Sequence, residues 1–390
     1  MLTFLHNQLF KTPNLPPNYP ETFHNRTIII TGANTGLGLA TAHHLARCRP
    51  KRLILAVRNP LAGESAKAAI LAAGTSTTTS TSTTDPSTTP KDGDMIEIWP
   101  LDLTSSASVL SFASRAEKSL GQGGLDVLVC NAGVATRTFS MVEGEEGGGG
   151  GGKGHERTVL VNVISTFLLV VLLVPVLRRS GVGVGRDLGE REGDRGAKAT
   201  ATPPVISIVG SEVHAFTMFP ERRAPEEKGV GVFEALDRPD MYYGIGTMAE
   251  RYPTSKLLDV LLARELAVRV GERIEGQEGQ GQGQGRGIVV NCVNPGLCRS
   301  ELTREADSML VRVGLKVLGR TCEVGARTLV AGAAGGWESH GQYMSNGVVC
   351  PSELSAFVCN EEGRSTQRRV WEELTLILEG IKPGVMDNLL

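Results

Sequence analysis

A tyrosine and a lysine four residues apart are the side chains of this sequence best suited to acid-base chemistry. Tyr252 and Lys256 stand in the run YPTSK, which leads into the apolar, helix-like stretch 257–262. Residues at positions i and i+4 share one helix face, so the ammonium can lie beside the phenol. A free tyrosine has a pKa of about 10, and a neighbouring cation lowers it. The pair could therefore move a proton near neutral pH, although an exposed helix face would show the same spacing.

Polar or small residues follow three strand-like runs. Ser211 comes after the run 205–209, and its hydroxyl can donate to a substrate carbonyl oxygen. The motif Asn131-Ala132-Gly133 ends the run 125–130, and Pro295-Gly296 follow the run 287–293. In open α/β sheets ligands bind beyond the carboxyl ends of the strands, so these residues are predicted to line one crevice. Taken alone, Ser211 would read as a cap or turn residue.

An almost wholly apolar stretch, 159–177, contains one amide, Asn162. A buried amide must be hydrogen-bonded, so Asn162 is either a structural tie or a member of a proton relay. The stretch is long enough to span a bilayer. It also contains Ser165, Thr166 and Pro175 and lies between two predicted strands. We expect a helix buried against a sheet, with a subunit contact as a further use, rather than a membrane span.

A glycine-rich turn stands between the strand-like run 27–31 and the helix-like run 39–47. This arrangement places a pyrophosphate at a helix N-terminus. Gly32 permits a sharp turn, and Gly36 and Gly38 remove side chains where backbone approaches phosphate or sheet. The turn is predicted to bind a nucleotide through Thr31, Gly32, Asn34, Thr35, Gly36, Leu37 and Gly38.

Strand-like and helical stretches alternate along the chain, which predicts an α/β fold with a doubly wound parallel sheet of Rossmann type. The predicted strands are 27–31, 52–57, 95–99, 125–130, 205–209, 287–293 and one near 341–349. We predict a single domain over residues 26–350, an N-terminal extension 1–25 and a C-terminal extension 351–390. Low-complexity inserts near 75–92, 143–154, 180–202 and 272–287 are predicted to be flexible surface loops.

Composition excludes several classes of protein. The chain has 390 residues, 41% hydrophobic and 21% charged, which is typical of a globular protein. A net charge of −2 without a basic block gives no support for a nucleic-acid partner. Seven scattered cysteines include no C-x-x-C pair, and residues 1–25 do not form a convincing secretory signal. We therefore expect reduced thiols and a cytoplasmic location.

These motifs, in this order, resemble the short-chain dehydrogenase/reductase family, and most closely its retinol-dehydrogenase-like branch in filamentous-fungal metabolism. The resemblance covers residues 27–300 well and extends more loosely to Val349. It implies that Tyr252 is the catalytic acid/base and that Lys256 lowers its pKa and binds the nicotinamide ribose. It further implies that Ser211 positions the reacting oxygen and that Asn162 completes a proton relay through water.

The resemblance also extends the set of cofactor-binding residues. Asp102 is similar to an adenine-contacting aspartate, with Leu103 beside it. Asn131, Ala132 and Gly133 form the motif N-A-G, and Pro295 and Gly296 form the far wall of the cofactor site. Ser300 stands where threonine is usual and keeps a hydroxyl for the carboxamide. Gly210 and Cys130 replace a common serine and a common asparagine, which we expect to be tolerated.

The cofactor can be argued from the end of the second strand. An enzyme that uses NAD favours an acidic residue there for the ribose 2′-hydroxyl. This strand ends in Val57-Arg58-Asn59, and Arg58 offers a cation to a 2′-phosphate. The sequence therefore favours NADP(H), although a solvated surface arginine would look the same.

The sequence as a whole predicts an NADP(H)-dependent oxidoreductase that transfers hydride between nicotinamide and a carbonyl/alcohol substrate, a lipophilic small molecule or secondary-metabolite intermediate. Two alternatives stay open: a catalytically idle nucleotide-binding interaction protein, and a membrane-associated lipid or retinoid dehydrogenase. The presence of both Tyr252 and Lys256 argues against the first alternative. A homodimer is a further expectation, and no metal site is expected.

Overall fold

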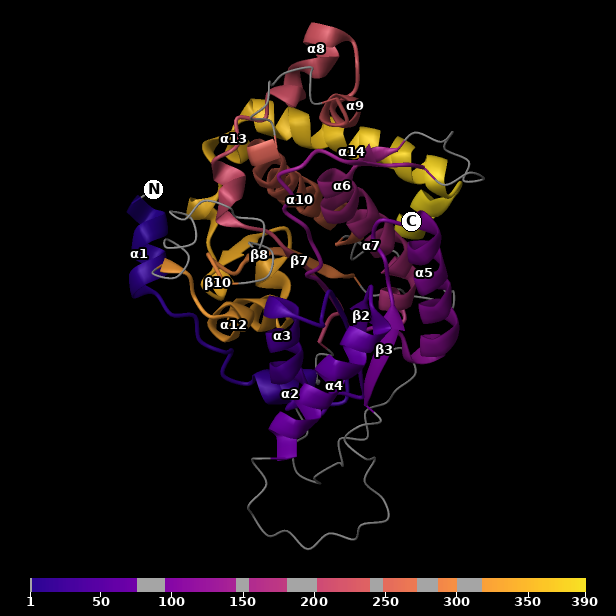
Figure 1. Cartoon of the computed structure of the whole chain (residues 1–390), viewed down its shortest axis with the longest axis vertical. Coiled ribbons are helices and arrows are strands. Elements are labelled where there is room, and N and C mark those ends of the chain that lie inside the picture. The colour runs from indigo at the N-terminus through magenta and orange to yellow at the C-terminus, as the bar shows by residue number, and fades with distance from the viewer. Residues whose placement is uncertain are drawn as a thin grey trace, which may run out of the picture.

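The computed structural model describes residues 2–75, 95–144, 154–180, 202–238, 248–271, 287–299 and 318–390. The four predicted inserts fall almost wholly outside these ranges, and so does Ser300. The described part of the chain forms an α/β fold around one large sheet (Figure 1).

The central sheet has eight strands in the order β10-β9-β8-β7-β4-β1-β2-β3. Their bounds are β1 Thr27–Thr31, β2 Arg52–Val57, β3 Ile96–Pro100, β4 Val127–Cys130, β7 Val205–Val209, β8 Val289–Asn294, β9 Tyr343–Ser345 and β10 Val348–Val349. All neighbours pair in parallel except β9 and β10. The predicted Rossmann-type, doubly wound sheet is confirmed.

The direction of winding reverses between β1 and β4. From β1 the chain adds β2 and β3 on one side, then returns to pair β4 with the opposite edge of β1. Such a reversal opens a crevice at the carboxyl ends of the two strands, because the following loops diverge to opposite sides. The crevice lies beside Thr31 and Cys130, where the sequence predicts a ligand site.

Alternating side chains of the strands fill two separate cores. On β1, Ile29 faces one core, and Ile28 and Ile30 face the other. The second core is covered by α3 (Gly36–Ala46), α4 (Pro60–Thr75) and α12 (Cys322–Ala333). The first is covered by α5 (Ser106–Leu120), α7 (Ser165–Arg178), α10 (Met248–Val270) and α14 (Glu361–Ile381). Burial on both faces explains why the strands read as continuous apolar runs.

The apolar stretch 159–177 runs through a short helix α6 (Arg157–Val159), a π-helical turn η2 (Leu160–Ile164) and α7. By length and composition, the helix Arg157–Arg178 could cross a membrane, but 83% of its most apolar window is buried inside the protein. It packs against α5 and the final turn η8 (Val385–Leu389). Such burial is typical of a helix that packs in the core of a protein, which is the alternative that the sequence favours for this stretch.

Both ends of the chain pack onto the body of the protein (Figure 1). In α1 (Leu2–Phe10), the Gln8 side chain donates to the carbonyl oxygens of Leu297 and Leu318, each at 2.7 Å. At the other end, Arg178 donates to the carbonyl oxygens of Asn388 and Leu389, at 3.0 and 2.8 Å. Residues 351–390, predicted as an extension, supply Trp371 and other side chains to the first core.

Shorter elements complete the described fold. They are α2 (Tyr19–Phe23), η1 (Gly121–Gly123), β5 (Met141–Val142), β6 (His155–Glu156), η3 (Glu212–Ala215), η4 (Pro220–Arg223), α8 (Ala224–Lys228), α9 (Val232–Leu236), η6 (Trp337–Ser339), η7 (Pro351–Glu353) and α13 (Ala356–Cys359).

Candidate active site

The glycine-rich turn links β1 to α3, and its backbone requires glycine. Gly32 and Gly36 have φ of +65° and +57°, a region that side chains with a Cβ rarely adopt. The Gly32 amide donates to the carbonyl of Ala56 on β2, at 2.8 Å. A Cβ on Gly38 would clash with the carbonyl oxygen of Gly32, so α3 begins tightly packed against the turn. The start of α3 therefore presents backbone N–H groups to the crevice, a geometry suited to phosphate.

Thr31 and Asn131 hold this turn in place. The Thr31 hydroxyl accepts from the backbone amides of Asn131 and Ala132, at 3.0 and 2.9 Å. The Asn131 side-chain amide donates to the carbonyls of Thr31 and Gly32, at 2.9 and 3.3 Å. The Asn131 side chain thus holds the turn in shape, and its predicted role in cofactor binding stays a prediction.

A cleft of about 540 Å³ runs from the glycine-rich turn along the carboxyl ends of the strands. Of the residues predicted to bind cofactor or substrate, nearly all of those described line it: Gly32, Asn34, Thr35, Gly36, Leu37, Arg58, Asp102, Leu103, Asn131, Ala132, Gly133, Ser211, Tyr252, Lys256, Pro295 and Gly296. Thr31, Gly38 and Asn162 are buried behind its wall. Segments more than 200 residues apart in the sequence are therefore brought together in one cavity.

Ser211 follows β7 with an extended backbone, and its hydroxyl faces the cleft. Its oxygen accepts weakly from the Val213 amide at 3.3 Å, and the Ser211 side chain lowers the pKa of the neighbouring Tyr252 phenol. The Ser211 carbonyl oxygen lies 2.7 Å from Nδ1 of His214, and Nε2 of that ring accepts from the amide of Ser355. Nδ1 must then carry the proton, so neutral His214 fixes the strand end that presents Ser211.

Tyr252 and Lys256 occupy one face of α10, with the Lys256 Nζ 5.7 Å from the centre of the Tyr252 ring. Burial raises the pKa of the Tyr252 phenol; Lys256 and the nearby Ser211 side chain lower it, but offset only part of the increase. The expected influence of Lys256 thus has the right sign, but a net lowered pKa does not follow from the protein alone. The sequence spacing predicts that Lys256 is a neighbour of Tyr252, but it does not predict the burial of Tyr252, which has the larger effect on its pKa.

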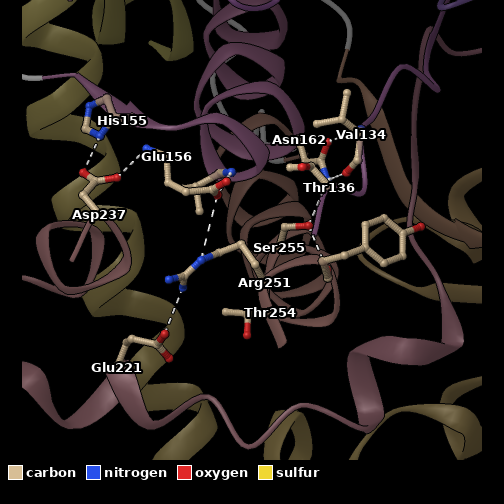
Figure 2. A network of polar contacts seen from close by, with 12 residues as sticks. Val134, Thr136, His155, Glu156, Asn162, Glu221, Asp237, Arg251, Thr254 and Ser255 are labelled. Atoms are coloured by element: carbon tan, nitrogen blue, oxygen red, sulfur yellow. Dashed lines mark hydrogen bonds and ion pairs between the residues drawn. The ribbon is translucent and has the colours of Figure 1, made fainter. Parts of the chain in front are cut away.

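Asn162 is fully engaged by protein groups, as Figure 2 shows. Its side-chain oxygen accepts from the Val134 amide at 2.8 Å, and its nitrogen donates to the Val134 carbonyl and the Ser255 hydroxyl, both at 2.9 Å. Ser255 in turn donates to the Tyr252 carbonyl at 2.8 Å. Of the two roles weighed for Asn162, this geometry is that of a structural tie, which joins η2, the loop after Asn131 and α10.

A buried ion-pair network lies directly before Tyr252 (Figure 2). Arg251, only 1% exposed, donates to Glu221 at 2.9 Å, and its Nε lies 3.9 Å from Glu156. Burial raises the pKa of both carboxyl groups, while Arg251 lowers them. The network joins η4 and β6 to α10.

The remaining predicted residues differ in how freely they face the cleft. Arg58 is exposed at the end of β2, with a guanidinium that makes no ion pair among the described residues. Asp102 uses one carboxylate oxygen to accept from the amide and hydroxyl of Thr104, at 2.9 and 2.7 Å. Gly210 lies so close to Cys292 that a Cβ would stand 2.6 Å from the sulfur, so the absence of serine there matches this neighbour.

Three side chains around the site escaped the sequence analysis: Asp259, His214 and Arg251. Asp259 lies 2.9 Å from the Lys256 Nζ and completes an i, i+4, i+7 stripe with Tyr252 and Lys256. That stripe is visible in the sequence, but Asp259 stands within an apolar run, which by itself predicts only a helix. His214 and Arg251 depend on partners that no local pattern identifies.

Within the described residues, no group of three or more His, Cys, Asp or Glu side chains could hold a metal ion. All seven cysteines fall in the described ranges, and all are free thiols.

Comparison with known proteins agrees with this fold and site. The profile of the short chain dehydrogenase family matches residues 26–184. A short chain dehydrogenase/reductase of Cryptosporiopsis sp. is 34% identical over 386 residues, 99% of this chain and 99% of that protein. A short-chain dehydrogenase of Penicillium roqueforti is 35% identical over 387 residues, 98% of this chain and 84% of that protein.

Among solved structures, an uncharacterized protein from Mycobacterium paratuberculosis matches with a TM-score of 0.55 at 21% identity, over 94% of this chain and 96% of that one. That likeness shows the same fold. The chain belongs to the short-chain dehydrogenase/reductase family. It is accordingly an oxidoreductase of a family that uses a nicotinamide dinucleotide.

Proposed function

We propose that the protein is an NADP(H)-dependent carbonyl reductase or alcohol dehydrogenase in which Tyr252, Ser211 and Lys256 do the acid-base work. The observation that carries the proposal is that these three side chains line the same cleft as the glycine-rich turn. A cofactor that places its phosphates at the turn can then extend along the strand ends towards the hydroxyl groups of Ser211 and Tyr252.

The residues of the cleft fit such a cofactor. Gly133 has no side chain to fill the space between Asn162 and Lys256. A Cβ at this position would stand 3.2 Å from the Asn162 side-chain oxygen and 4.0 Å from the Lys256 Nζ. The Ser211 hydroxyl donates to the substrate oxygen and orients it towards Tyr252. In reduction, the Tyr252 hydroxyl gives its proton to that oxygen, and Lys256 stabilises the phenolate left behind. When bound, the nicotinamide supplies or accepts the hydride.

We propose NADP(H) over NAD(H) on the basis of Arg58. Its guanidinium borders the cleft at the end of β2, with Asn59 beside it. A guanidinium binds phosphate through charge-assisted, often bidentate, hydrogen bonds. The favourable position for a 2′-phosphate is therefore at this strand end.

The substrate we propose is a lipophilic ketone, aldehyde or secondary alcohol, such as an intermediate of secondary metabolism. Val134, Val161, Val213 and Leu297 line the cleft together with Ser211 and Tyr252. Apolar lining residues favour apolar ligands, and the hydroxyl groups are then left to orient the reacting oxygen. The same apolar wall supports a place in the retinol-dehydrogenase-like branch of the family.

The test is a screen of the purified protein with NADPH and NADH against a panel of ketones and aldehydes, including aromatic ketones, medium-chain aldehydes and retinaldehyde. Oxidation of NADPH with at least one carbonyl is the expected result. Tight binding of NADPH without turnover of any carbonyl or alcohol would favour the catalytically idle alternative. Activity that requires added lipid vesicles would favour the membrane-associated alternative.

We further propose a cytoplasmic location and a homodimer. Free thiols at all seven cysteines support a reducing compartment. Because the helix Arg157–Arg178 is already covered within one chain, a dimer would have to use another surface. Light scattering of the purified protein tests the oligomeric state.

A further inference from the structure

The face of α10 that carries Tyr252 and Lys256 carries a third ionisable residue, Asp259. Both partners are buried: Asp259 is 1% exposed and Lys256 is 6% exposed. The Lys256 Nζ donates to the Asp259 Oδ2 at 2.9 Å and to the Val209 carbonyl at 2.8 Å. An ammonium has three N–H groups, so these contacts use two and leave one for the cleft.

Burial of this ammonium needs a compensating charge. A lysine taken out of water loses hydration and tends to release its proton. Burial accordingly lowers the pKa of Lys256, but Asp259 and, to a smaller extent, Tyr252 more than offset this, and the pKa is raised above its usual value. Burial raises the pKa of Asp259 to about 6 against the opposing influence of Lys256, so the carboxyl group is ionised at pH 7 to 8.

The other groups that face this pair do not replace Asp259. The thiols of Cys130 on β4 and Cys292 on β8 lie near the pair, and burial raises the pKa of both far above neutral pH, so they are uncharged. Glu212 on η3 acts on Tyr252 and raises its pKa. Asp259 is thus the carboxylate that contacts Lys256 among the described residues.

We propose that Asp259 is a positioning residue of the active site, whose carboxylate keeps Lys256 charged and directed past Val209 towards the Tyr252 ring. The proposal rests on the proposed function, because it assigns Asp259 a part in the acid-base work of Tyr252. Asp259 acts through Lys256 and does not itself reach the reacting atoms.

Loss of the Asp259 carboxylate can shift the pKa of Tyr252 in either direction. If Asp259 were lost and Lys256 became neutral, Tyr252 would lose its cationic neighbour and its pKa would rise further. If Lys256 kept its charge without Asp259, removal of a negative charge would lower the Tyr252 pKa. The two cases shift the titration of Tyr252 in opposite directions, which makes the proposal decidable.

The experiment is Asp259→Asn, which keeps the shape of the side chain and removes the charge. Alcohol oxidation with NADP+ requires the Tyr252 phenolate, so the rate falls on the acid side of the Tyr252 pKa. We expect this acid limb to move to higher pH by about one unit, a roughly tenfold loss of rate on the limb. Asp259→Leu, whose own side chain brings no polar atom into the site, is a second variant with the same expected shift.

A matched control is Glu221→Gln. It also removes a buried carboxylate that pairs with a cation of α10, Arg251 at 2.9 Å, but it makes no contact with Lys256. We expect lower stability and an unchanged acid limb. An acid limb that stays in place or moves to lower pH in a folded Asp259 variant would overturn the proposal.

A titration that does not depend on turnover separates this proposal from the proposed function. The ultraviolet absorbance of the Tyr252 phenolate can be obtained as the difference between the protein and its Tyr252→Phe form across pH. The Asp259 variants should show this absorbance at higher pH even if no substrate is found. A titration identical to that of the unaltered protein would reject the role of Asp259 whatever the enzyme acts on.

Discussion

Replacement of Asn162 by alanine tests whether this side chain ties the site together. The change removes three hydrogen bonds, to the Val134 amide, the Val134 carbonyl and the Ser255 hydroxyl. Each contributes about 0.5–1.5 kcal/mol net, so the three amount to about 2–4 kcal/mol of the free energy of unfolding. A loss of this size lowers the Tm of a chain of this length by about 3 °C or more.

The assay is urea unfolding together with NADPH titration. Because Val134 and Gly133 line the cleft, release of their loop should weaken NADPH binding as well as stability. Thr166→Val serves as a control on the same helix, since it removes the single hydrogen bond from Thr166 to the Val161 carbonyl at 2.9 Å and leaves the loop tied. The opposite result would be a free energy of unfolding of Asn162→Ala within about 0.5 kcal/mol of that of the unaltered protein, together with a large loss of kcat. It would refute the structural role and favour a proton relay through Asn162.

Four further outcomes follow from the same structure. Tyr252→Phe removes the transferable proton and keeps the ring, so kcat should fall about a hundredfold or more with NADPH affinity kept; near-normal turnover would reject its assignment. We expect the unaltered protein to prefer NADPH over NADH by about tenfold, the low end for an exposed guanidinium, and Arg58→Ala to abolish this preference. Lys51→Ala, at an exposed position outside the cleft, should leave the preference intact. Equal binding of both cofactors by the unaltered protein would contradict the role of Arg58. Gly38→Ala should weaken NADPH at least about tenfold in a fluorescence titration, because the Cβ would displace the glycine-rich turn; unchanged affinity would show that α3 can shift without cost. Burial raises the pKa of the Cys48 thiol to about 12, so iodoacetamide at pH 7.5 should label the exposed Cys359 and spare Cys48, as mass spectrometry of peptides would show; rapid labelling of Cys48 would indicate that α3 opens.

The sequence predicted the sheet well because its central strands β1, β4, β7 and β8 are buried along their whole length. The runs at 27–31, 52–57 and 205–209 match β1, β2 and β7 residue for residue. Boundaries moved by one or two residues elsewhere, as at β8, which begins at Val289 and continues to Asn294. The antiparallel pairing of β10 with β9 was not predicted, since two residues carry no periodicity.

The site was predicted where motifs are local and missed where partners are distant. The pair Tyr252 and Lys256 is a short local pattern, and so is the glycine-rich turn, each within its own stretch of chain. The pairing of Arg251 with Glu221 and of His214 with Ser355 joins separate segments, so no spacing reveals it. The net pKa of Tyr252 depends on its burial, which is a property of the packed protein.

Two helices of this fold, α1 and α7, have hydrogen-bond partners that are synthesised much later in the chain. Gln8 finds its partners at Leu297 and Leu318, and Arg178 finds its partners at Asn388 and Leu389. A chain that emerges from the ribosome N-terminus first has made its glycine-rich turn and its most apolar helix long before these partners exist. Until the final turn Val385–Leu389 emerges, one flank of α7 has no cover. Chaperone capture of the nascent polypeptide is therefore expected to centre on residues 165–178 and to last until Val385–Leu389 has left the ribosome.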